Sequence, residues 1–129
     1  MNFPPQLESD VNALREEGHK VSVCRDQVNS SRIFVVFESY VLPKGWSKVD
    51  TNLLLITDVS YPNSKLDMFW VDEDLHLAGG KLPQAAESLE TYLGKSWRRF
   101  SWHVRKWNPA VDNIATYLHT VDARLKQLQ

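Results

Sequence analysis

The strongest constraint on the fold is a run of β-branched and aromatic residues, RIFVVFESYVL, at positions 32–42. Such side chains suit the pleated surface of a sheet, so this run predicts a central strand. A second run, NLLLITDV at 52–59, is apolar enough to be buried on both faces. Residues 21–26 and 67–75 are two further strand candidates. Because the loops between the four runs are short, they predict an antiparallel meander.

A helix is predicted before these strands. In residues 6–17, Leu7, Val11 and Leu14 recur at i, i+4 and i+7, which gives one apolar stripe along a helix. A second helical pattern, with apolar side chains on one side, covers residues 83–93 after the last strand. These patterns predict helices on both sides of the meander in sequence.

The chain ends in a strong helical pattern. Apolar side chains recur with helical spacing from Val111 to Leu125. Asn108 is a good N-cap residue, and Pro109 suits the first helical position. The whole order predicts an α+β fold in which helices cover one face of the sheet.

The bulk composition narrows the class of protein. A chain of 129 residues is expected to form one domain, residues 1–129, with a single core. A net charge of −1 gives no overall field that would draw the chain to nucleic acid or membrane. No apolar run approaches the roughly 20 residues of a membrane span, and the N-terminus lacks the features of a secretory signal. With Cys24 alone, we expect a cytoplasmic protein without disulfide bonds.

Three short motifs occur in the order found in ubiquitin-conjugating enzymes: a Tyr-Pro pair before the fourth strand, a Leu-His pair after it, and a Trp-x-Pro step before the last helix. They are Tyr61-Pro62, Leu75-His76 and Trp107-Asn108-Pro109. The segments 68–86 and 97–118 more closely resemble family E, a prokaryotic branch of that superfamily. The resemblance implies the fold of that superfamily: an N-terminal helix, a four-stranded antiparallel meander, an irregular active-site segment and a C-terminal helix. It also implies a setting in bacterial operons that encode ubiquitin-like modifiers and activating enzymes.

The sequence departs from the superfamily at two places. Conjugating enzymes carry the modifier on a cysteine between the histidine motif and the Trp-x-Pro step, but residues 77–106 contain no cysteine. The Pro-Asn pair that follows the histidine in the superfamily is replaced by Leu77 and Ala78. Cys24 lies in the first predicted strand, where a free cysteine is usually a small core residue.

Ser101 and His103 are the candidates to replace the missing thiol, because they lie shortly before Trp107. If the backbone is extended, their i, i+2 spacing points both side chains to one face, and Phe100 and Trp102 point into the core. A serine needs a base to act as a nucleophile, and histidine titrates in the right range to serve as that base. His103 could instead carry the acyl group as an acyl-imidazole, and His76 is a further candidate base. In the alternative interpretation, all three are ordinary surface or hydrogen-bonded residues.

A basic cluster interleaved with tryptophans surrounds these candidates. Its predicted partner-binding members are Arg98, Arg99, Arg105 and Lys106. We interpret the cluster as a docking surface for an acidic partner, such as an activating enzyme or a modifier. The alternative is that the arginine stems only pack on tryptophan faces. Nucleic acid is not expected as a partner, because the charge is confined to one segment.

Four carboxylates around the fourth predicted strand, Asp67, Asp72, Glu73 and Asp74, are interpreted as a solvated strand end. They lack accompanying histidine or cysteine ligands, and the four histidines lack the spacing of a zinc site. We therefore expect no metal and no cofactor.

Two functions remain from the sequence. In the first, the chain is a transferase that accepts a ubiquitin-like modifier from an activating enzyme and passes it on from Ser101 or His103. In the second, it is an inactive conjugating-enzyme variant that binds a modifier or another partner. The clustered serine and histidines favour the first, and the missing cysteine and Pro-Asn pair favour the second. An unrelated adaptor with the same helix and strand order is a third possibility.

Overall fold

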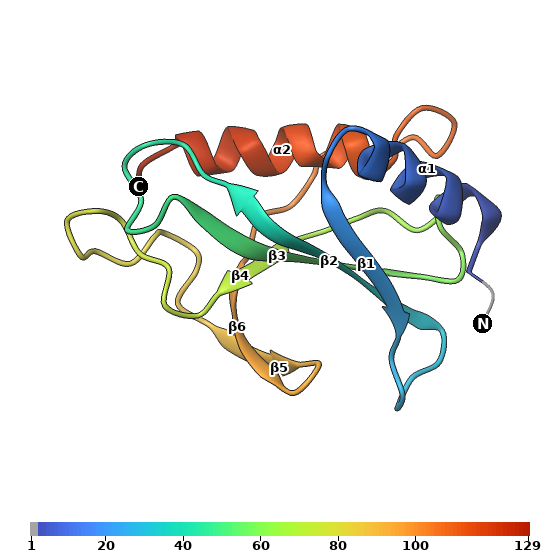
Figure 1. Ribbon diagram of the computed structural model, residues 1–129, viewed down its shortest axis with the longest axis horizontal. Helices are drawn as coiled ribbons and strands as arrows, with labels where there is room; N and C mark the ends of the chain where they lie inside the picture. The colour runs from blue at the N-terminus through green and yellow to red at the C-terminus, as the bar shows by residue number, and fades with distance from the viewer. Residues whose placement is uncertain (1–2) are drawn as a thin grey trace.

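The computed structural model describes residues 3–129. The elements in this range are α1 (Pro5–Glu16), β1 (Lys20–Arg25), β2 (Arg32–Val41), β3 (Asp50–Asp58), β4 (Phe69–Asp72), β5 (Leu89–Tyr92), β6 (Lys95–Phe100) and α2 (Ile114–Lys126). Both helices lie on the same side of the sheet (Figure 1). The predicted α+β class, with an N-terminal and a C-terminal helix, is therefore confirmed.

The described strands form one antiparallel sheet in the order β1-β2-β3-β4-β6-β5. Strands β1 to β4 pair in sequence order, so the predicted four-stranded meander is confirmed. The sheet then continues through β6, which pairs with β4 in a register that places Phe69 opposite Phe100 and Asp72 opposite Trp97. This extension adds two strands that the sequence patterns did not predict.

The core lies between the sheet and the two helices. The predicted stripe of α1, Leu7, Val11 and Leu14, is buried there. Alternate residues of β2, such as Val35 and Phe37, point to the same side because successive side chains of a strand point to opposite faces. The two amphipathic patterns therefore meet in one apolar layer.

The opposite face of the sheet carries a second apolar cluster of Phe34, Leu54, Trp70 and Trp97. The β5–β6 hairpin lies on this side, away from the helices (Figure 1). Its Tyr92 ring packs 5.6 Å from the ring of Phe34. Because the β5–β6 hairpin covers this face and the helices cover the other, β3 is apolar on both faces, as its sequence predicted.

The predicted helix over residues 83–93 is wrong. Residues 89–92 form β5, which pairs with β6 through a two-residue turn at Leu93 and Gly94. Both turn residues have positive φ, 57° and 70°, as the favoured hairpin turn requires. Pairing with β6 satisfies the backbone groups of this segment and overrides its helical pattern.

The predicted start of the last helix is also wrong. Asn108 accepts a hydrogen bond from the N–H of Ala110 in a turn, and α2 begins at Ile114. Asn113 is the N-cap, because its side chain accepts from the N–H of Thr116 while the Thr116 hydroxyl accepts from the N–H of Asn113. The reciprocal capping box outweighs the preference of Pro109 for a first helical turn.

No helix within residues 3–129 combines the length and the apolar character that crossing a membrane requires.

Candidate functional site

The side chain of His103 is held by a carboxylate. Its Nδ1 lies 2.9 Å from Oδ2 and 3.0 Å from Oδ1 of Asp67, which comes just before β4. The main chains of the two segments are also joined, because the N–H of Met68 donates to the carbonyl of Trp102 over 2.9 Å. This bond aligns the residue before β4 with the residue after β6 and brings Asp67 and His103 together.

The pairing determines which nitrogen of His103 faces outward. An ionised carboxylate can only accept, so Asp67 favours the tautomer with a proton on Nδ1. The His103 side chain is 61% exposed, while that of Asp67 is 27% exposed. In the neutral ring the lone pair is then on Nε2, for which no partner is recorded within residues 3–129. An imidazole held in this way can act as a base or as a nucleophile.

Ser101 is placed differently from its prediction. The N–H of Trp102 donates to the carbonyl of Phe100 over 2.9 Å, which closes a tight turn at Ser101. The backbone is therefore not extended here, and the condition for a face shared by Ser101 and His103 is absent. The hydroxyl of Ser101 accepts a hydrogen bond of 3.2 Å from Nε of Arg99, and its N–H donates to the carbonyl of Ala85.

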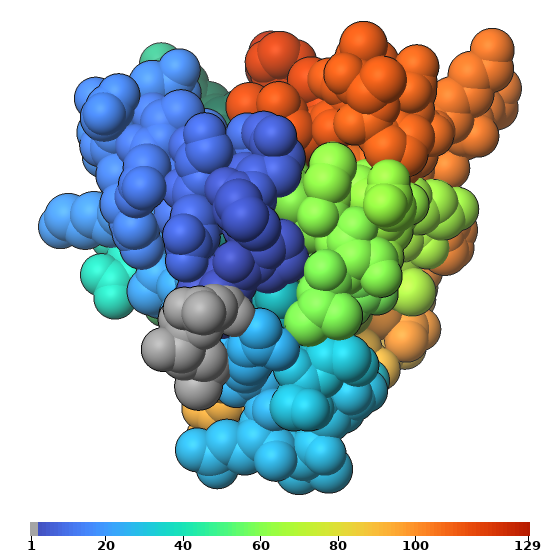
Figure 2. Space-filling model, turned by 90° about the vertical axis from the view of Figure 1, so that its right-hand side faces the viewer, coloured from blue at the N-terminus to red at the C-terminus, as the bar shows by residue number. Residues whose placement is uncertain are grey.

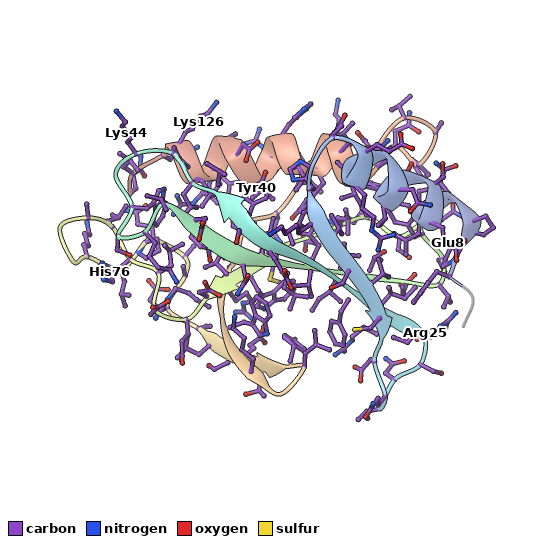
Figure 3. All side chains as sticks on the ribbon, in the orientation of Figure 1. Glu8, Arg25, Tyr40, Lys44, His76 and Lys126 are labelled. Carbon is purple, nitrogen blue, oxygen red and sulfur yellow. The ribbon has the colours of Figure 1, made fainter. Side chains whose placement is uncertain are left out.

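His76 lies in the loop after β4, at the same end of the molecule as Lys44 (Figure 3). Its Nδ1 is 2.7 Å from the carbonyl oxygen of Leu77. Its backbone exchanges two hydrogen bonds with Ser47: its N–H donates to the Ser47 hydroxyl and its carbonyl accepts from the Ser47 N–H. These contacts connect the loop after β4 to the loop between β2 and β3.

Strand β4 separates the three predicted site residues into two places. Its register with β6 places Ser101 and His103 beyond the first residue of β4, whereas His76 follows its last residue. Four strand residues span about 13 Å. Among residues 3–129, no recorded hydrogen bond joins any two of Ser101, His103 and His76. The structure therefore offers a His103–Asp67 pair, with Ser101 near it in sequence and His76 elsewhere.

The predicted basic cluster also divides. Arg98 is buried, and its donors are bound by the carbonyls of Glu73 and Ala86. Arg99 contacts Glu90 over 3.3 Å as well as Ser101. Arg105 and Lys106 are exposed in the segment between β6 and α2. Only the last two of the four present their charge on an open surface.

The carboxylate of Asp72 is enclosed by cations, contrary to the interpretation as a solvated strand end. It is 2.7 Å from Nζ of Lys95 and 2.9 Å from Nζ of Lys48, and it accepts from the N–H of Asn52. Burial opposes its ionisation, but the hydrogen bonds from Lys95, Lys48 and Asn52 outweigh burial and lower its pKa to about 2. This carboxylate is a structural anchor between β3, β4 and β6.

Cys24 lies on the face of β1 that carries the second apolar cluster. Burial, together with the charge of Asp26, raises the pKa of its thiol. Because the thiolate is the reactive form, this environment disfavours reaction at the cysteine. Its place in β1, opposite Phe34 of β2, agrees with its interpretation as a packing residue.

A groove of about 590 Å³ lies between the end of α1, the end of β2 and α2. His19, Tyr40, His119 and Asp122 line it, and the hydroxyl of Tyr40 donates to Asp122 over 2.6 Å. The lining includes none of Asp67, Ser101 and His103, so the His103–Asp67 pair lies outside this groove.

Two of the three family-like motifs, Tyr61-Pro62 and Trp107-Asn108-Pro109, are joined by hydrogen bonds near α1. The hydroxyl of Tyr61 donates to Asp10 of α1 and accepts from the N–H of Ile114 at the start of α2. The indole of Trp107 donates to the carbonyl of Pro62. Figure 2 shows this loop after β3 (green) in contact with α1 (blue) and with the segment that leads into α2 (orange). The Tyr-Pro and Trp-x-Pro motifs are therefore structural connections that hold the segment after His103 in place.

Sequence reasoning missed two residues. The sequence predicted Asp67 to be part of a solvated strand end. Asp67 lies just before β4 and His103 lies just after β6, so the pairing of these two strands is the signal that would have brought the two residues together. Arg124 lies inside the helical pattern of α2 and gave no signal, yet it is almost fully buried.

Comparisons with known proteins place this arrangement in a family. Searches of curated proteins and of solved structures found no significant match. The model of a family described as Prokaryotic E2 family E matches residues 6–128, nearly the whole chain. The α+β order of helix, antiparallel sheet and helix is consistent with that match. The chain therefore belongs to prokaryotic E2 family E, a family of conjugating-enzyme-like proteins.

Proposed function

We propose that this protein accepts a ubiquitin-like modifier from an activating enzyme and passes it on, with His103 as the residue that carries the acyl group. The observation that supports this most directly is the exposed imidazole whose Nδ1 is held by Asp67. Family membership supports the partners, and the missing cysteine makes another nucleophile necessary. Of the two predicted replacements, His103 has an orienting carboxylate, whereas the hydroxyl of Ser101 accepts from the Arg99 guanidinium, a group that cannot take up its proton.

The proposed transfer has two steps. The Nε2 lone pair of His103 attacks the carbonyl carbon of the modifier's thioester on the activating enzyme, so that a C–N bond forms and the thiolate leaves with the C–S electron pair. Asp67 accepts a hydrogen bond from Nδ1 of His103, so the proton stays on that nitrogen. The negative charge of Asp67 offsets the positive charge of the acylated ring. An amine then attacks the same carbon, the imidazole leaves as the neutral ring, and the amine loses its proton to solvent.

The second candidate is a non-covalent binding module for the same modifier. It is favoured by the separation of Ser101, His103 and His76 at the two ends of β4. It is also favoured by the missing Pro-Asn pair, because the asparagine of that pair is the side chain that would stabilise the oxyanion of a transfer step. In this case Arg105 and Lys106, both exposed, are the residues of the predicted basic cluster that remain available to an acidic partner.

One experiment separates the two functions. The full chain is mixed with a bacterial activating enzyme, a ubiquitin-like modifier and ATP, and covalent adducts are followed by mass spectrometry. We expect an adduct that hydroxylamine removes, that is lost in His103→Ala and that persists in Ser101→Ala. His119→Ala is the matched control, because His119 is an exposed histidine on α2.

The other outcomes are equally specific. An adduct that disappears in Ser101→Ala and maps to that residue shows an oxyester and rules out His103 as the carrier. If the wild type forms no adduct but retains the modifier in a binding assay, the chain is the non-covalent module.

A further inference from the structure

Arg124 is a buried cation whose contacts within residues 3–129 are aromatic rings and main-chain oxygens. Its side chain is 1% exposed, and no carboxylate side chain within residues 3–129 is recorded in contact with it. A buried charge is costly unless its donors are satisfied. Here the guanidinium lies 5.0 Å from the centre of the Phe100 ring and 5.3 Å from that of Trp102, and its N–H groups point to main-chain oxygens.

Those oxygens come largely from the segment after α2, residues 127–129. Arg124 donates through Nη1 to the carbonyl of Gln127 over 2.9 Å. Through Nη2 it donates to the main-chain oxygen of Gln129 over 3.1 Å and to the carbonyl of Gln84 over 2.9 Å. The Gln129 oxygen also accepts from the N–H of Gln84 over 3.0 Å. The segment therefore binds through its main chain, as a peptide ligand does.

A side-chain contact completes this binding. Leu128 covers Gly45, which has a φ of +111°, and a Cβ at Gly45 would collide with both terminal methyl carbons of Leu128. The indole of Trp46 donates to the carbonyl of Leu125 and holds the end of α2 against the same loop. Figure 3 shows Lys126, the last residue of α2 before the segment, at the same end of the molecule as Lys44, the neighbour of Gly45.

We infer that Gly45, Gln84 and Arg124 form a binding seat for an extended peptide with a leucine side chain, which residues 127–129 occupy in the free protein. Resting on the proposed function, we assign the seat to the extended C-terminal tail of the ubiquitin-like modifier, which displaces the chain's own segment. The seat supplies one main-chain N–H, one guanidinium and, at Gly45, a backbone surface without a Cβ against which the leucine side chain packs. These are the groups that recognise a carbonyl-rich peptide, and the Arg124 guanidinium can also donate to a carboxylate.

The position of the seat relates it to the predicted site. Gln84 binds the segment 127–129, and the next residue, Ala85, accepts the N–H of Ser101. Trp102, whose ring packs on Arg124, directly precedes His103. A peptide in the seat therefore lies against the same short stretch of chain that presents His103.

The seat can be tested with the full chain and a short peptide. The Leu128→Ser variant, labelled with ¹⁵N, is titrated with the N-acetylated peptide Lys-Gln-Leu-Gln, which has the sequence of residues 126–129. We expect the Gln84 amide and Arg124 guanidinium signals to shift and saturate. The wild type should bind the peptide at least tenfold more weakly, because its own segment competes at millimolar effective concentration.

Matched controls make the result specific. Leu93→Ser removes a leucine of nearly equal exposure, 48% against 49%, from a hairpin turn and should bind like the wild type. The peptide with serine in place of leucine should not bind. Adding Gly45→Ala to Leu128→Ser should abolish binding, because the new Cβ would collide with the methyl carbons of a leucine bound as Leu128 is. Equal binding to wild type and Leu128→Ser, or no binding to either, overturns the seat.

Competition separates this inference from the proposed function. Intact modifier should displace the peptide from Leu128→Ser. If the modifier binds the chain but leaves the peptide in place, the seat does not serve the modifier, and the proposed function survives without it. If the peptide binds but the modifier does not bind the chain at all, both the assigned occupant and the proposed function are wrong.

Discussion

Asp67 and Asp72 lie at opposite ends of β4 and bind different kinds of partner. Asp72, with a side chain 15% exposed, is surrounded by two lysines and a main-chain N–H, and every contact holds strands together. Asp67 pairs with one exposed imidazole and leaves the far nitrogen of that ring facing solvent. The difference separates a carboxylate that is bound into the fold from one whose histidine partner is largely exposed.

The largest expected effect comes from breaking the Asp67 pair. Asp67→Asn keeps the shape of the side chain but offers an amide that no longer favours the proton on Nδ1 of His103. Loss of such an orienting partner usually costs about 10–100-fold in activity. We expect the rate of adduct formation to fall by that factor, while the free energy of unfolding, measured with urea, changes by less than about 0.5 kcal/mol, as is typical of exposed pairs. A large loss of stability with an unchanged rate would reverse the roles assigned to the two carboxylates.

The Asp72→Asn variant should show the opposite pattern. Relative to its ordinary value, the pKa of Asp72 is lowered to about 2, and a shift of this size corresponds to about 2 kcal/mol of folding free energy at pH 7. We expect the free energy of unfolding to fall by about that amount while adduct formation by the remaining folded protein is retained. Asp74→Asn is the control, since Asp74 contacts Lys48 but is 71% exposed.

The same stabilisation should depend on pH in a defined direction. Because the pKa is lower in the folded state, the ionised form is favoured by folding, so the contribution of Asp72 is complete above about pH 4. It is lost as the pH falls from about 4 through about 2, and only below about 2 is the carboxyl mostly protonated in both states. Urea unfolding of wild type and Asp72→Asn should therefore converge across this window. A constant difference from pH 6 to pH 2 would show that the effect of the substitution is not electrostatic.

The smallest effects should distinguish the two lysines of the Asp72 cluster. Lys95→Met and Lys48→Met should each lower the free energy of unfolding by about 0.5–1 kcal/mol, since both ammonium groups are partly exposed. Lys95→Met should cost more, because Nζ of Lys95 also lies 4.2 Å from the centre of the Trp97 ring. The order of the two midpoints in urea tests this, and a larger loss for Lys48→Met would contradict it.

The elements that depend on local patterns were predictable from the sequence. The stripe of α1 and the four strands of the meander follow from the spacing of apolar residues, and short loops leave few ways to pair consecutive strands. The β5 strand and the start of α2 were not predictable in this way. One depends on pairing with β6, and the other on a capping box that competes with an equally plausible Asn-Pro start.

The sequence by itself therefore determined which residue types can replace the missing thiol and which segments carry the apolar faces. Only the tertiary structure decided that His103 meets Asp67, 36 residues away, and that Arg124 binds Gln84, 40 residues away. It also decided that a turn at Ser101 and the length of β4 keep the serine and His76 out of that pair. The physical reason is that periodicity records which side of an element is buried, whereas contacts between polar side chains depend on strand register and loop closure, which local sequence does not encode.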